Sequence, residues 1–295
     1  MADNRPRTGL LTPGILHRLA LIVCTFTLIG CEEPSRTPYD PYAAGAAATH
    51  TATFAWPEGK KAALSLTFDD ARLSQPDVGI PLLNRYRVKG TFYVTPAAVE
   101  RRLDAWKDAV AAGHEIANHT LVHPCSANFT WSRDKAVEGY DLAKIAAEID
   151  EADRQIEALL GVTPTTFAYP CGHTFVGRGV DTKSYVPVVA QRFLVGRCAF
   201  NEIGNDPLYC DLAQATGVSM DELDFLKVKA MIEQAAAEGR WLILFGHEIG
   251  PAARQTVPSQ TLEAICRYAN DPANGVWLDT VENIGKYILE QRQGK

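Results

Sequence analysis

The sequence predicts an α/β fold in which a parallel sheet is connected by helical crossovers. Short apolar runs typical of buried strands alternate with segments whose apolar residues recur at helical spacing. The 295 residues include 46% hydrophobic and 22% charged side chains, as in an ordinary globular protein. No internal repeat or second linker interrupts the alternation, so we expect one large domain. The pattern alone does not separate a barrel from an open sheet.

Residues 1–30 are expected to be a targeting segment and are left out of the fold prediction. The apolar run from Leu19 to Ile29 is shorter than the roughly 20 residues of a membrane-spanning helix. It is typical of the apolar part of a secretory signal. The run ends in Leu-Ile-Gly-Cys, which resembles a bacterial lipoprotein signal and makes Cys31 the expected lipidated residue. The alternative is an ordinary signal peptide with a chance cysteine.

The regions after Cys31 differ in composition. Residues 31–55 are rich in Pro, Ala and Thr, which indicates a flexible tether, and the folded domain is expected over residues 56–295. We therefore expect an exported protein, lipid-anchored at a bacterial membrane and facing the periplasm or the cell exterior.

The net charge of −6, without a Lys/Arg cluster, argues against nucleic-acid binding. The oligomeric state does not follow from the sequence.

Run length and periodicity predict the elements in the first half of the domain. Ala62–Thr67 and Thr91–Thr95 indicate buried strands. Asp104–Ala112 indicates a helix that ends at Gly113, followed by a short strand at Glu115–Ala117. A long helix ending at Gly161 is predicted by an apolar stripe consisting of Leu142, Ile145, Ile149, Ile156 and Leu159.

The second half continues the alternation. Phe167–Tyr169 and Phe193–Gly196 indicate short strands. Ser219 and Glu222 have the spacing of a capping box, ahead of a helix that reaches about Glu238. The remaining predicted elements are a strand at Trp241–Phe245, a helix at Leu262–Ala269, a strand at Val276–Leu278 and a helix at Val281–Glu290.

Two polar clusters that follow predicted strands indicate a metal site. Active sites of parallel α/β folds lie at the carboxyl ends of the strands. Asp69 and Asp70 end a Thr-Phe-Asp-Asp segment, and adjacent carboxylates need a compensating cation. His119 and His123 are four residues apart, so on a helical turn they would share one face and could hold one metal ion. Taken separately, the aspartates have a helix N-cap and a turn aspartate as the alternative, and the histidine pair has a surface or core coincidence.

Two further polar clusters are weaker evidence for an active site when each is taken alone. The Tyr-Pro-Cys-Gly segment that begins at Tyr169 marks a turn. His247 follows a Leu-Ile-Leu-Phe-Gly run and is either a satisfied hydrogen-bonding group or a general acid near neutral pH.

In this order, the four motifs resemble the polysaccharide deacetylase family, which includes chitooligosaccharide, chitin and peptidoglycan deacetylases. The resemblance extends from Ala62 to Tyr287, and the pairing of Thr-Phe-Asp-Asp with His-Thr-x-x-His is its most specific part. It implies a single catalytic domain folded as a distorted seven-stranded (β/α) barrel, which decides between the two architectures.

The resemblance also implies roles for individual residues. Asp70, His119 and His123 are the expected ligands of one divalent ion, which we expect to be zinc, with cobalt or another divalent metal as alternatives. Asp69 is the expected general base and His247 the expected general acid. The implied reaction is hydrolytic release of acetate from an N-acetylated carbohydrate such as a chitooligosaccharide or peptidoglycan. An O-acetyl esterase and an inactive carbohydrate-binding lipoprotein are the alternatives.

The third motif departs from the family pattern. The backbone N–H of Cys171 is expected to face the oxyanion, with Tyr169 and Pro170 in the substrate groove. The family often has an arginine before this turn, where it pairs with the catalytic aspartate. This chain has Ala168 there, and Arg197 is the candidate to supply the charge, with an ordinary surface arginine as the alternative.

The cysteines offer two possible pairs. By the resemblance, Cys125 and Cys171 both lie at the rim of the site, and we expect a disulfide between them, with two buried free thiols as the alternative. Cys198 and Cys210 are close enough in sequence to form a second pair.

Overall fold

The first strand, β1 (Ala62–Asp69), lies in the middle of the fold and is buried along its whole length. A continuous apolar run of this kind is typical of a parallel strand covered on both faces. The computed structural model describes residues 54–294, and these residues form one compact unit. The expected signal segment and nearly all of the expected tether lie outside the described residues.

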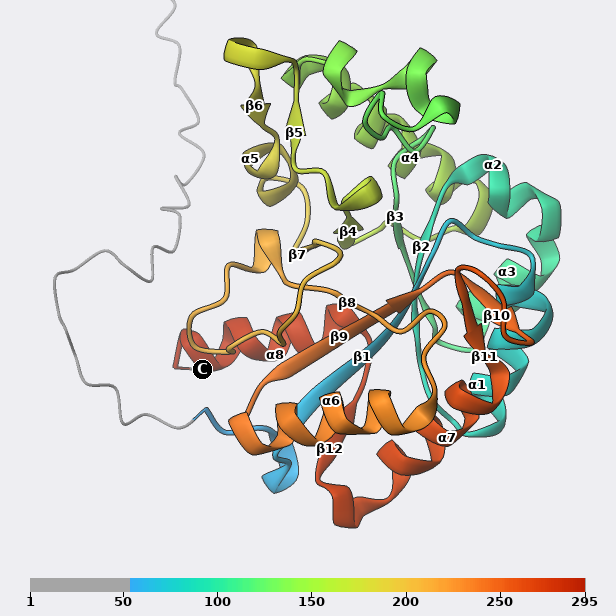
Figure 1. Cartoon of the computed structure of the whole chain (residues 1–295), viewed down its shortest axis with the longest axis vertical. Helices are drawn as coiled ribbons and strands as arrows, with labels where there is room; N and C mark the ends of the chain where they lie inside the picture. Colours follow the sequence, from blue (N-terminus) through green and yellow to red (C-terminus); the bar gives the residue numbers. More distant parts are fainter. Residues whose placement is uncertain (1–53, 295) are drawn as a thin grey trace, which may run out of the picture. The chain divides into compact units, whose positions relative to one another are not determined.

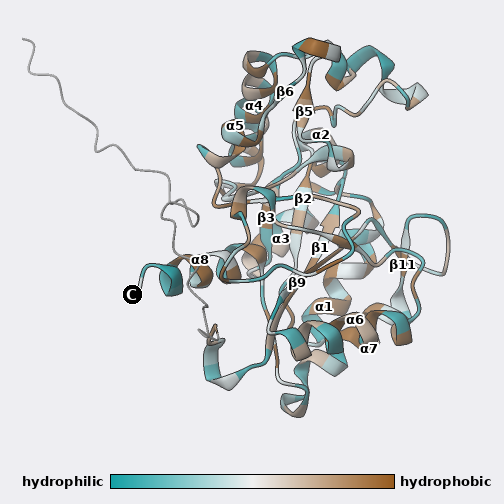
Figure 2. Cartoon of the chain, turned by 60° about the vertical axis from the view of Figure 1, so that its left-hand side comes forward, coloured by the Kyte–Doolittle hydropathy of each residue, from teal (hydrophilic) through white to brown (hydrophobic). Residues whose placement is uncertain are grey.

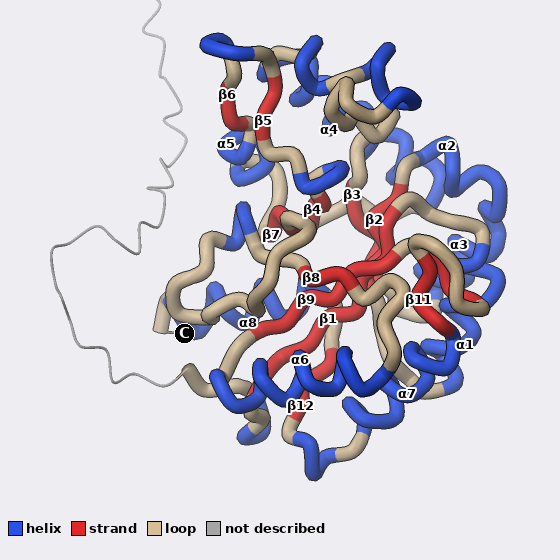
Figure 3. The backbone as a smooth tube through the Cα atoms, in the orientation of Figure 1, coloured by secondary structure: helices blue, strands red, loops and turns tan. Residues whose placement is uncertain are grey.

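The main sheet is parallel, with the strand order β7-β4-β3-β2-β1-β9-β8. An eighth strand, β12, pairs with the amino half of β1, on the edge whose carboxyl half pairs with β2. Figure 3 shows these strands crossing the centre of the molecule. The other strands of this sheet are β2 (Thr91–Val94), β3 (Glu115–Asn118), β4 (Thr166–Ala168), β7 (Val195–Arg197), β8 (Val218–Ser219), β9 (Trp241–Gly246) and β12 (Val276–Leu278).

The two ends of the curled sheet meet at a single bridge. Arg197 at the end of β7 pairs in parallel with Ala215, which lies just before β8. The Cys198 N–H donates to the Ala215 carbonyl at 2.7 Å, and the Ala215 N–H donates to the Gly196 carbonyl at 2.8 Å. The predicted distorted seven-stranded barrel is thereby confirmed, with β12 as an additional short strand.

Eight helices among the described residues pack around this sheet, and Figure 1 shows them on the outside of the strands. In Figure 2 many of their outward surfaces have the hydrophilic colour. The helices are α1 (Ile80–Arg85), α2 (Pro96–Val99), α3 (Leu103–Ala111), α4 (Leu142–Leu160), α5 (Val186–Ala190), α6 (Phe225–Glu238), α7 (Ser259–Asn270) and α8 (Val281–Arg292). Within residues 54–294, no helix has the length and apolar character needed to cross a membrane.

Two small sheets complete the fold. β5 (Phe175–Val176) and β6 (Lys183–Ser184) form an antiparallel pair, and β10 (Glu248–Gly250) pairs in parallel with β11 (Thr256–Pro258). The β5–β6 pair is joined to the segment before α4 by a bond from the Gly177 N–H to the Val137 carbonyl at 3.0 Å.

The start of α6 differs from the prediction. The capping-box assignment of Ser219 and Glu222 is wrong, because Ser219 belongs to β8, where it pairs with Phe245. The cap is Asp224, whose carboxylate accepts a hydrogen bond from the Lys227 N–H at 3.0 Å. The carboxylate satisfies one of the free N–H groups of the first helical turn, as the serine was expected to do.

Candidate metal centre and active site

The carboxyl ends of the parallel strands bring the sequence-predicted polar residues together. Asp69 is the last residue of β1, and Asp70 follows it. His119 follows β3, Arg197 ends β7, and His247 follows β9. Residues that are far apart in the sequence therefore meet at one edge of the barrel, where active sites of such folds lie.

Asp70, His119 and His123 have the arrangement of a metal site. One potential ligand atom from each lies within 4.8 Å of those of the other two. The Nε2 atoms of His119 and His123 lie 3.6 and 3.3 Å from Asp70 Oδ1. Two imidazoles and one carboxylate suit zinc and related divalent ions, and they leave coordination positions for water and substrate.

The backbone around His119 fixes which ring nitrogen faces Asp70. His119 Nδ1 lies 2.9 Å from the Ala168 carbonyl oxygen, an acceptor, so Nδ1 carries the proton. Nε2, the nitrogen that faces Asp70, is therefore the atom placed to bind a cation. This orientation is the one that a metal ligand requires.

A loop, not a helical turn, holds the two histidines. Thr120 and His123 adopt φ values of 64° and 54°, so the expectation of a shared helical face is wrong. The His123 N–H donates to Thr120 Oγ1 at 3.0 Å, and the Thr120 N–H donates to Asn118 Oδ1 at 2.6 Å. These local bonds replace the helical ones and turn both rings toward Asp70.

The charges around Asp70 favour its ionised form. Burial acts to raise the pKa of Asp70, but His119, His123, His247 and Arg72 outweigh it and lower the pKa to about 2. Arg72 binds Asp70 Oδ2 at 2.9 Å, while Oδ1 faces the histidines. Sequence reasoning missed Arg72, although it lies two residues after Asp70.

Burial also favours the neutral form of His123. Burial and, after it, nearby His119 lower the pKa of this residue to about 4, against the opposing effect of the aspartates. A neutral imidazole is the form that binds a metal. Both partners thus have the protonation state that a metal site needs.

Asp69 is held by Arg197, a fully buried cationic side chain. Arg197 is 0% exposed, and its Nη2 atom lies 2.6 Å from both carboxylate oxygens of Asp69. The guanidinium lies between two aromatic rings, at 5.0 Å from the centre of Tyr93 and 4.9 Å from that of Phe245. The alternative of an ordinary surface arginine is therefore wrong.

The β4–β7 register explains how Arg197 reaches Asp69. Ala168, the residue at the family's usual arginine position, is the direct partner of Arg197 in the β4–β7 ladder. The guanidinium thus comes from the neighbouring strand at the same level of the barrel. A positive charge therefore lies beside Asp69, as expected from the family pattern, but Arg197 supplies it in place of a residue at position 168.

Asp221 holds His247 in place, and sequence reasoning missed it. Asp221 Oδ2 lies 2.6 Å from His247 Nδ1, and Oδ1 accepts the His247 backbone N–H at 3.0 Å. Burial acts to lower the pKa of His247, but the Asp221 hydrogen bond, together with Asp69 and Asp70, raises it. Asp221 follows the short strand β8, which the periodicity did not reveal.

Gln75 is a second residue that sequence reasoning missed. Its buried Nε2 donates to the carbonyl of Asp69 at 2.6 Å and to that of His247 at 3.0 Å. One side chain therefore joins the backbone behind the expected base to the backbone behind the expected acid. No pattern in the sequence marks this glutamine.

The turn after β4 contains Cys171 in a left-handed conformation, with φ 55°. Tyr169 and Pro170 are both buried, and the Tyr169 hydroxyl donates to the Ala213 carbonyl at 2.7 Å. The assignment of these two side chains to the substrate groove is therefore wrong, because they support the turn from the inside. Cys171 and Gly172, the next residues of the turn, are only half-buried.

The structure contains the expected disulfide between Cys125 and Cys171, with a Cα–Cα distance of 5.9 Å. The two sulfur atoms also lie near His123, but a disulfide does not offer the thiolates that a metal requires. The candidate metal site is therefore the Asp70 cluster. Cys198 and Cys210 are both free, so the expectation of a second pair is wrong.

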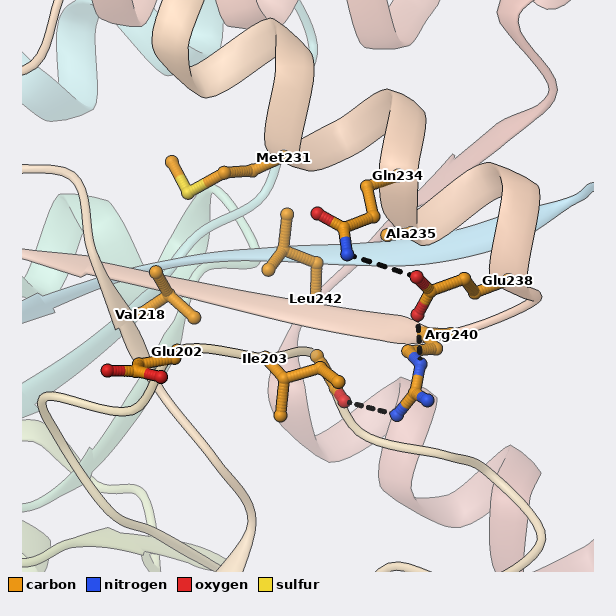
Figure 4. Close-up of a pocket in the computed structure, with 10 residues that line it drawn as sticks. Glu202, Ile203, Val218, Met231, Gln234, Ala235, Glu238, Arg240 and Leu242 are labelled. Carbon is orange, nitrogen blue, oxygen red and sulfur yellow. Dashed lines mark hydrogen bonds and ion pairs between the residues drawn. The ribbon is translucent and has the colours of Figure 1, made fainter.

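Figure 4 shows a small pocket beside α6, where Met231, Gln234 and Leu242 are among the lining residues. Its volume of about 20 Å³ has room for roughly one water molecule. It shares no residue with the cluster at the carboxyl ends of the strands, and it is too small for a sugar.

The fold and the site define a class: a curled parallel α/β barrel with a candidate metal cluster at the carboxyl ends of its strands. Residues 57–178 match the family model for polysaccharide deacetylase. The recognition based on the motifs is confirmed over these residues, which are similar to the polysaccharide deacetylase family. The matched region includes Asp69, Asp70, both histidines and Cys171, whereas Arg197 and His247 lie beyond it.

Two relatives match shorter stretches of this chain. A chitooligosaccharide deacetylase from Bradyrhizobium is 43% identical over 61 residues, which are 20% of this chain and 27% of the relative. The uncharacterised protein YlxY of Bacillus subtilis is 32% identical over 93 residues, which are 32% of this chain and 26% of the relative. The matches thus span about a quarter of each of these relatives.

A solved structure supports the fold over a longer stretch. A probable polysaccharide deacetylase from Pseudomonas aeruginosa superposes with a TM-score of 0.59 at 17% identity, over 81% of this chain and 94% of that one.

Proposed function

We propose that this protein is a metal-dependent hydrolase that removes acetyl groups from an N-acetylated carbohydrate and releases acetate. The observation that carries the proposal is the convergence of Asp70, His119 and His123 beside a second carboxylate, Asp69. The match of residues 57–178 to the polysaccharide deacetylase family model supports deacetylation of an acetylated carbohydrate.

The three candidate ligands fit a divalent cation. Asp70 is ionised, His123 is neutral, and His119 turns Nε2 toward the carboxylate. A divalent ion held there, zinc in our proposal, supplies Lewis acidity that polarises an acetyl carbonyl and makes a water more acidic. The donor set is compatible with cobalt as well.

The two neighbouring aspartates have different roles in the proposal. Asp70 adopts φ 75°, so the chain turns sharply after β1, and the two carboxylates face different partners. Asp70 faces the histidines, whereas Asp69 is held by Arg197. We assign Asp69 as the general base that takes the proton of the attacking water.

His247 is assigned as the general acid. Its Nδ1 is bound to Asp221, so Nε2 remains to donate a proton to the leaving nitrogen. The raised pKa of His247 favours the protonated form that an acid needs. The Cys171 N–H is assigned to the developing oxyanion, where one such donor contributes about 3 kcal/mol.

The direct test is acetate release from chitin oligomers, peptidoglycan and acetylated xylan, with and without a chelator. We expect the chelator to abolish the release and zinc to restore it. Equal rates with and without chelator would show that no metal takes part. A strict preference for the ester-linked acetyl groups of xylan would favour an O-acetyl esterase. Carbohydrate binding without turnover would indicate an inactive binding protein.

The location of the protein is also a proposal. Support comes from the sequence alone, from the apolar run that ends at Cys31. We propose export and lipid anchoring through Cys31. Mass spectrometry of the mature protein should find a lipidated N-terminal cysteine, and an unmodified peptide that spans Gly30 and Cys31 would reject the anchor.

A further inference from the structure

The disulfide between Cys125 and Cys171 lies against His123, at the ring nitrogen that does not face Asp70. Cys125 Sγ lies 3.6 Å from His123 Nδ1, whereas His123 Nε2 lies 3.3 Å from Asp70 Oδ1. One potential ligand atom from each of His123, Cys125 and Cys171 lies within 4.8 Å of those of the other two. The two nitrogens of one imidazole ring therefore face two different groups of potential ligands.

The sulfur side of this ring has the dimensions of a zinc site once the sulfur atoms are thiolates. Zinc bonds of about 2.3 Å to sulfur and about 2.0 Å to nitrogen place the two ligand atoms about 3.5 Å apart in a tetrahedral site. The observed separation of Cys125 Sγ and His123 Nδ1 is 3.6 Å. Two thiolates on one zinc lie about 3.8 Å apart, so the sulfur atoms need only separate from bonding distance. Two cysteines and one histidine, with water as the fourth ligand, are a ligand set that zinc adopts.

Both cysteines are held in place by bonds that do not depend on the disulfide. The Cys125 N–H donates to the Ser132 hydroxyl at 2.9 Å, and the same hydroxyl donates to the Cys125 carbonyl at 3.0 Å. The turn that contains Cys171 is closed by a bond from the Gly172 N–H to the Tyr169 carbonyl at 2.9 Å. Because the two Cα atoms lie 5.9 Å apart and both segments are held, the two thiols stay close to each other after reduction.

We propose that reduction of the disulfide creates a zinc site formed by the thiolates of Cys125 and Cys171 and the Nδ1 atom of His123. A neutral imidazole has one lone pair, so His123 serves either this site or the Asp70 cluster at any one time. Thiolates are the softer ligands and are favoured by zinc. Reduction therefore moves His123 to the sulfur side and leaves the Asp70 cluster with two of its three candidate ligands. The thiolate site goes beyond the proposed function and does not depend on it.

The reductant is a dithiol, which supplies both electrons by thiol–disulfide exchange. Cys125 is 0% exposed and Cys171 is half-buried, so Cys171 is the sulfur that a reductant can reach. The first thiolate of the reductant bonds to Cys171 Sγ, the S–S bond breaks, and Cys125 leaves as a thiolate. The second thiol of the reductant then displaces Cys171 as a thiolate, and the reductant becomes a disulfide. Its two protons pass to water when the metal binds both thiolates.

The test is cobalt(II) binding to the full chain, because a cobalt–thiolate bond has a near-ultraviolet charge-transfer absorption that oxygen and nitrogen ligands lack. The disulfide form is compared with protein that is reduced by dithiothreitol and then freed of it by anaerobic gel filtration. We expect the absorption in the reduced form and none in the disulfide form. Excess zinc should remove the absorption, because it takes the same ligands.

Variants of the reduced protein identify the ligands. For His123→Ala we expect cobalt affinity to fall by at least about 10–100-fold, since even the loss of a ligand's hydrogen-bond partner has an effect of that size. The double variant Cys125→Ser with Cys171→Ser should lose the absorption. Asp70→Asn should keep it, because Asp70 lies on the other side of the ring. Cys266→Ala, which removes a buried free cysteine on α7, is the matched control and should also keep it.

Circular dichroism and thermal unfolding establish whether the reduced form keeps its fold. A reduced protein that unfolds, or that binds cobalt without the thiolate absorption, would overturn the proposal. So would an absorption that persists in the double cysteine variant, because it would come from other cysteines. None of these measurements uses acetate release, so failure of the thiolate site and failure of the proposed function are observed separately.

Discussion

Arg197 and Asp69 form a charge pair in which each partner depends on the other. Arg197 is fully enclosed, with aromatic rings around its guanidinium, so it has no access to water in place of Asp69. Removing one partner of such a buried pair leaves an uncompensated charge. The pair therefore places a cationic partner against both oxygens of the carboxylate that is assigned as the base.

For Arg197→Ala we expect a fall in kcat/KM of about 100-fold or more and a loss of about 3–5 kcal/mol in the free energy of unfolding. Denaturant unfolding and acetate release measure the two effects. The double variant Asp69→Asn with Arg197→Met, which removes both charges, should recover stability and remain inactive. An Arg197→Ala protein with wild-type stability and rate would contradict the assignment.

Asp221 controls the proton on His247. Its hydrogen bond to Nδ1 stabilises the imidazolium and contributes to the raised pKa of His247. The activity of a general acid is lost as the pH rises through its pKa, so removing the negative charge should move this loss to lower pH.

For Asp221→Asn we therefore expect the alkaline limb of the kcat profile to shift to lower pH, with a fall in kcat of at most the roughly 10²–10⁴-fold contribution of an acid. The pH–rate profile of wild type and variant is the measurement. An alkaline limb at the same pH in both proteins would show that His247 is not the acid, or that Asp221 does not act on it.

At the scale of elements, the disulfide joins the two segments that frame the site. Cys125 lies two residues after His123, and Cys171 lies in the turn assigned to the oxyanion, 46 residues along the chain. In the chain-entropy model, closing a loop of this length stabilises the fold by about 4 kcal/mol. The bond therefore affects both overall stability and the position of a metal ligand.

For Cys125→Ala with Cys171→Ala we expect a loss of about 2–4 kcal/mol in the free energy of unfolding and weaker zinc binding. Thermal unfolding and metal titration of the double variant, next to a Cys266→Ala control, measure both effects. Cys266 is a buried free cysteine on α7, so the control removes a thiol without opening a link. Zinc affinity equal to the wild type would show that the disulfide does not position His123.

The elements also show what sequence patterns can and cannot predict. β1 and β9 were predictable because strands buried on both faces are continuous apolar runs. β8 is too short to show an alternating pattern, so neither its position nor Asp221, two residues after it, was predicted. The loop of the histidines was misassigned because i, i+4 spacing also fits left-handed turns held by side-chain bonds.

At the scale of the whole molecule, the motifs were enough to predict the barrel, because the family resemblance covers most of the domain. The candidate role of Arg197 followed from the absence of an arginine at Ala168, and the β4–β7 register gives the physical reason. Arg72 and Gln75 were not predicted, because their positions depend on tertiary contacts that no local pattern records. The sequence therefore indicated the chemistry better than the substrate groove.

The most direct test of the account is a zinc titration of the metal-free protein by calorimetry, with Asp70→Asn, His119→Ala and His123→Ala as variants. The account predicts one zinc ion per wild-type chain and a loss of binding in each variant, while the Cys266→Ala control binds as the wild type does. A wild-type protein that binds no divalent ion, or variants that bind zinc with unchanged affinity, would contradict it.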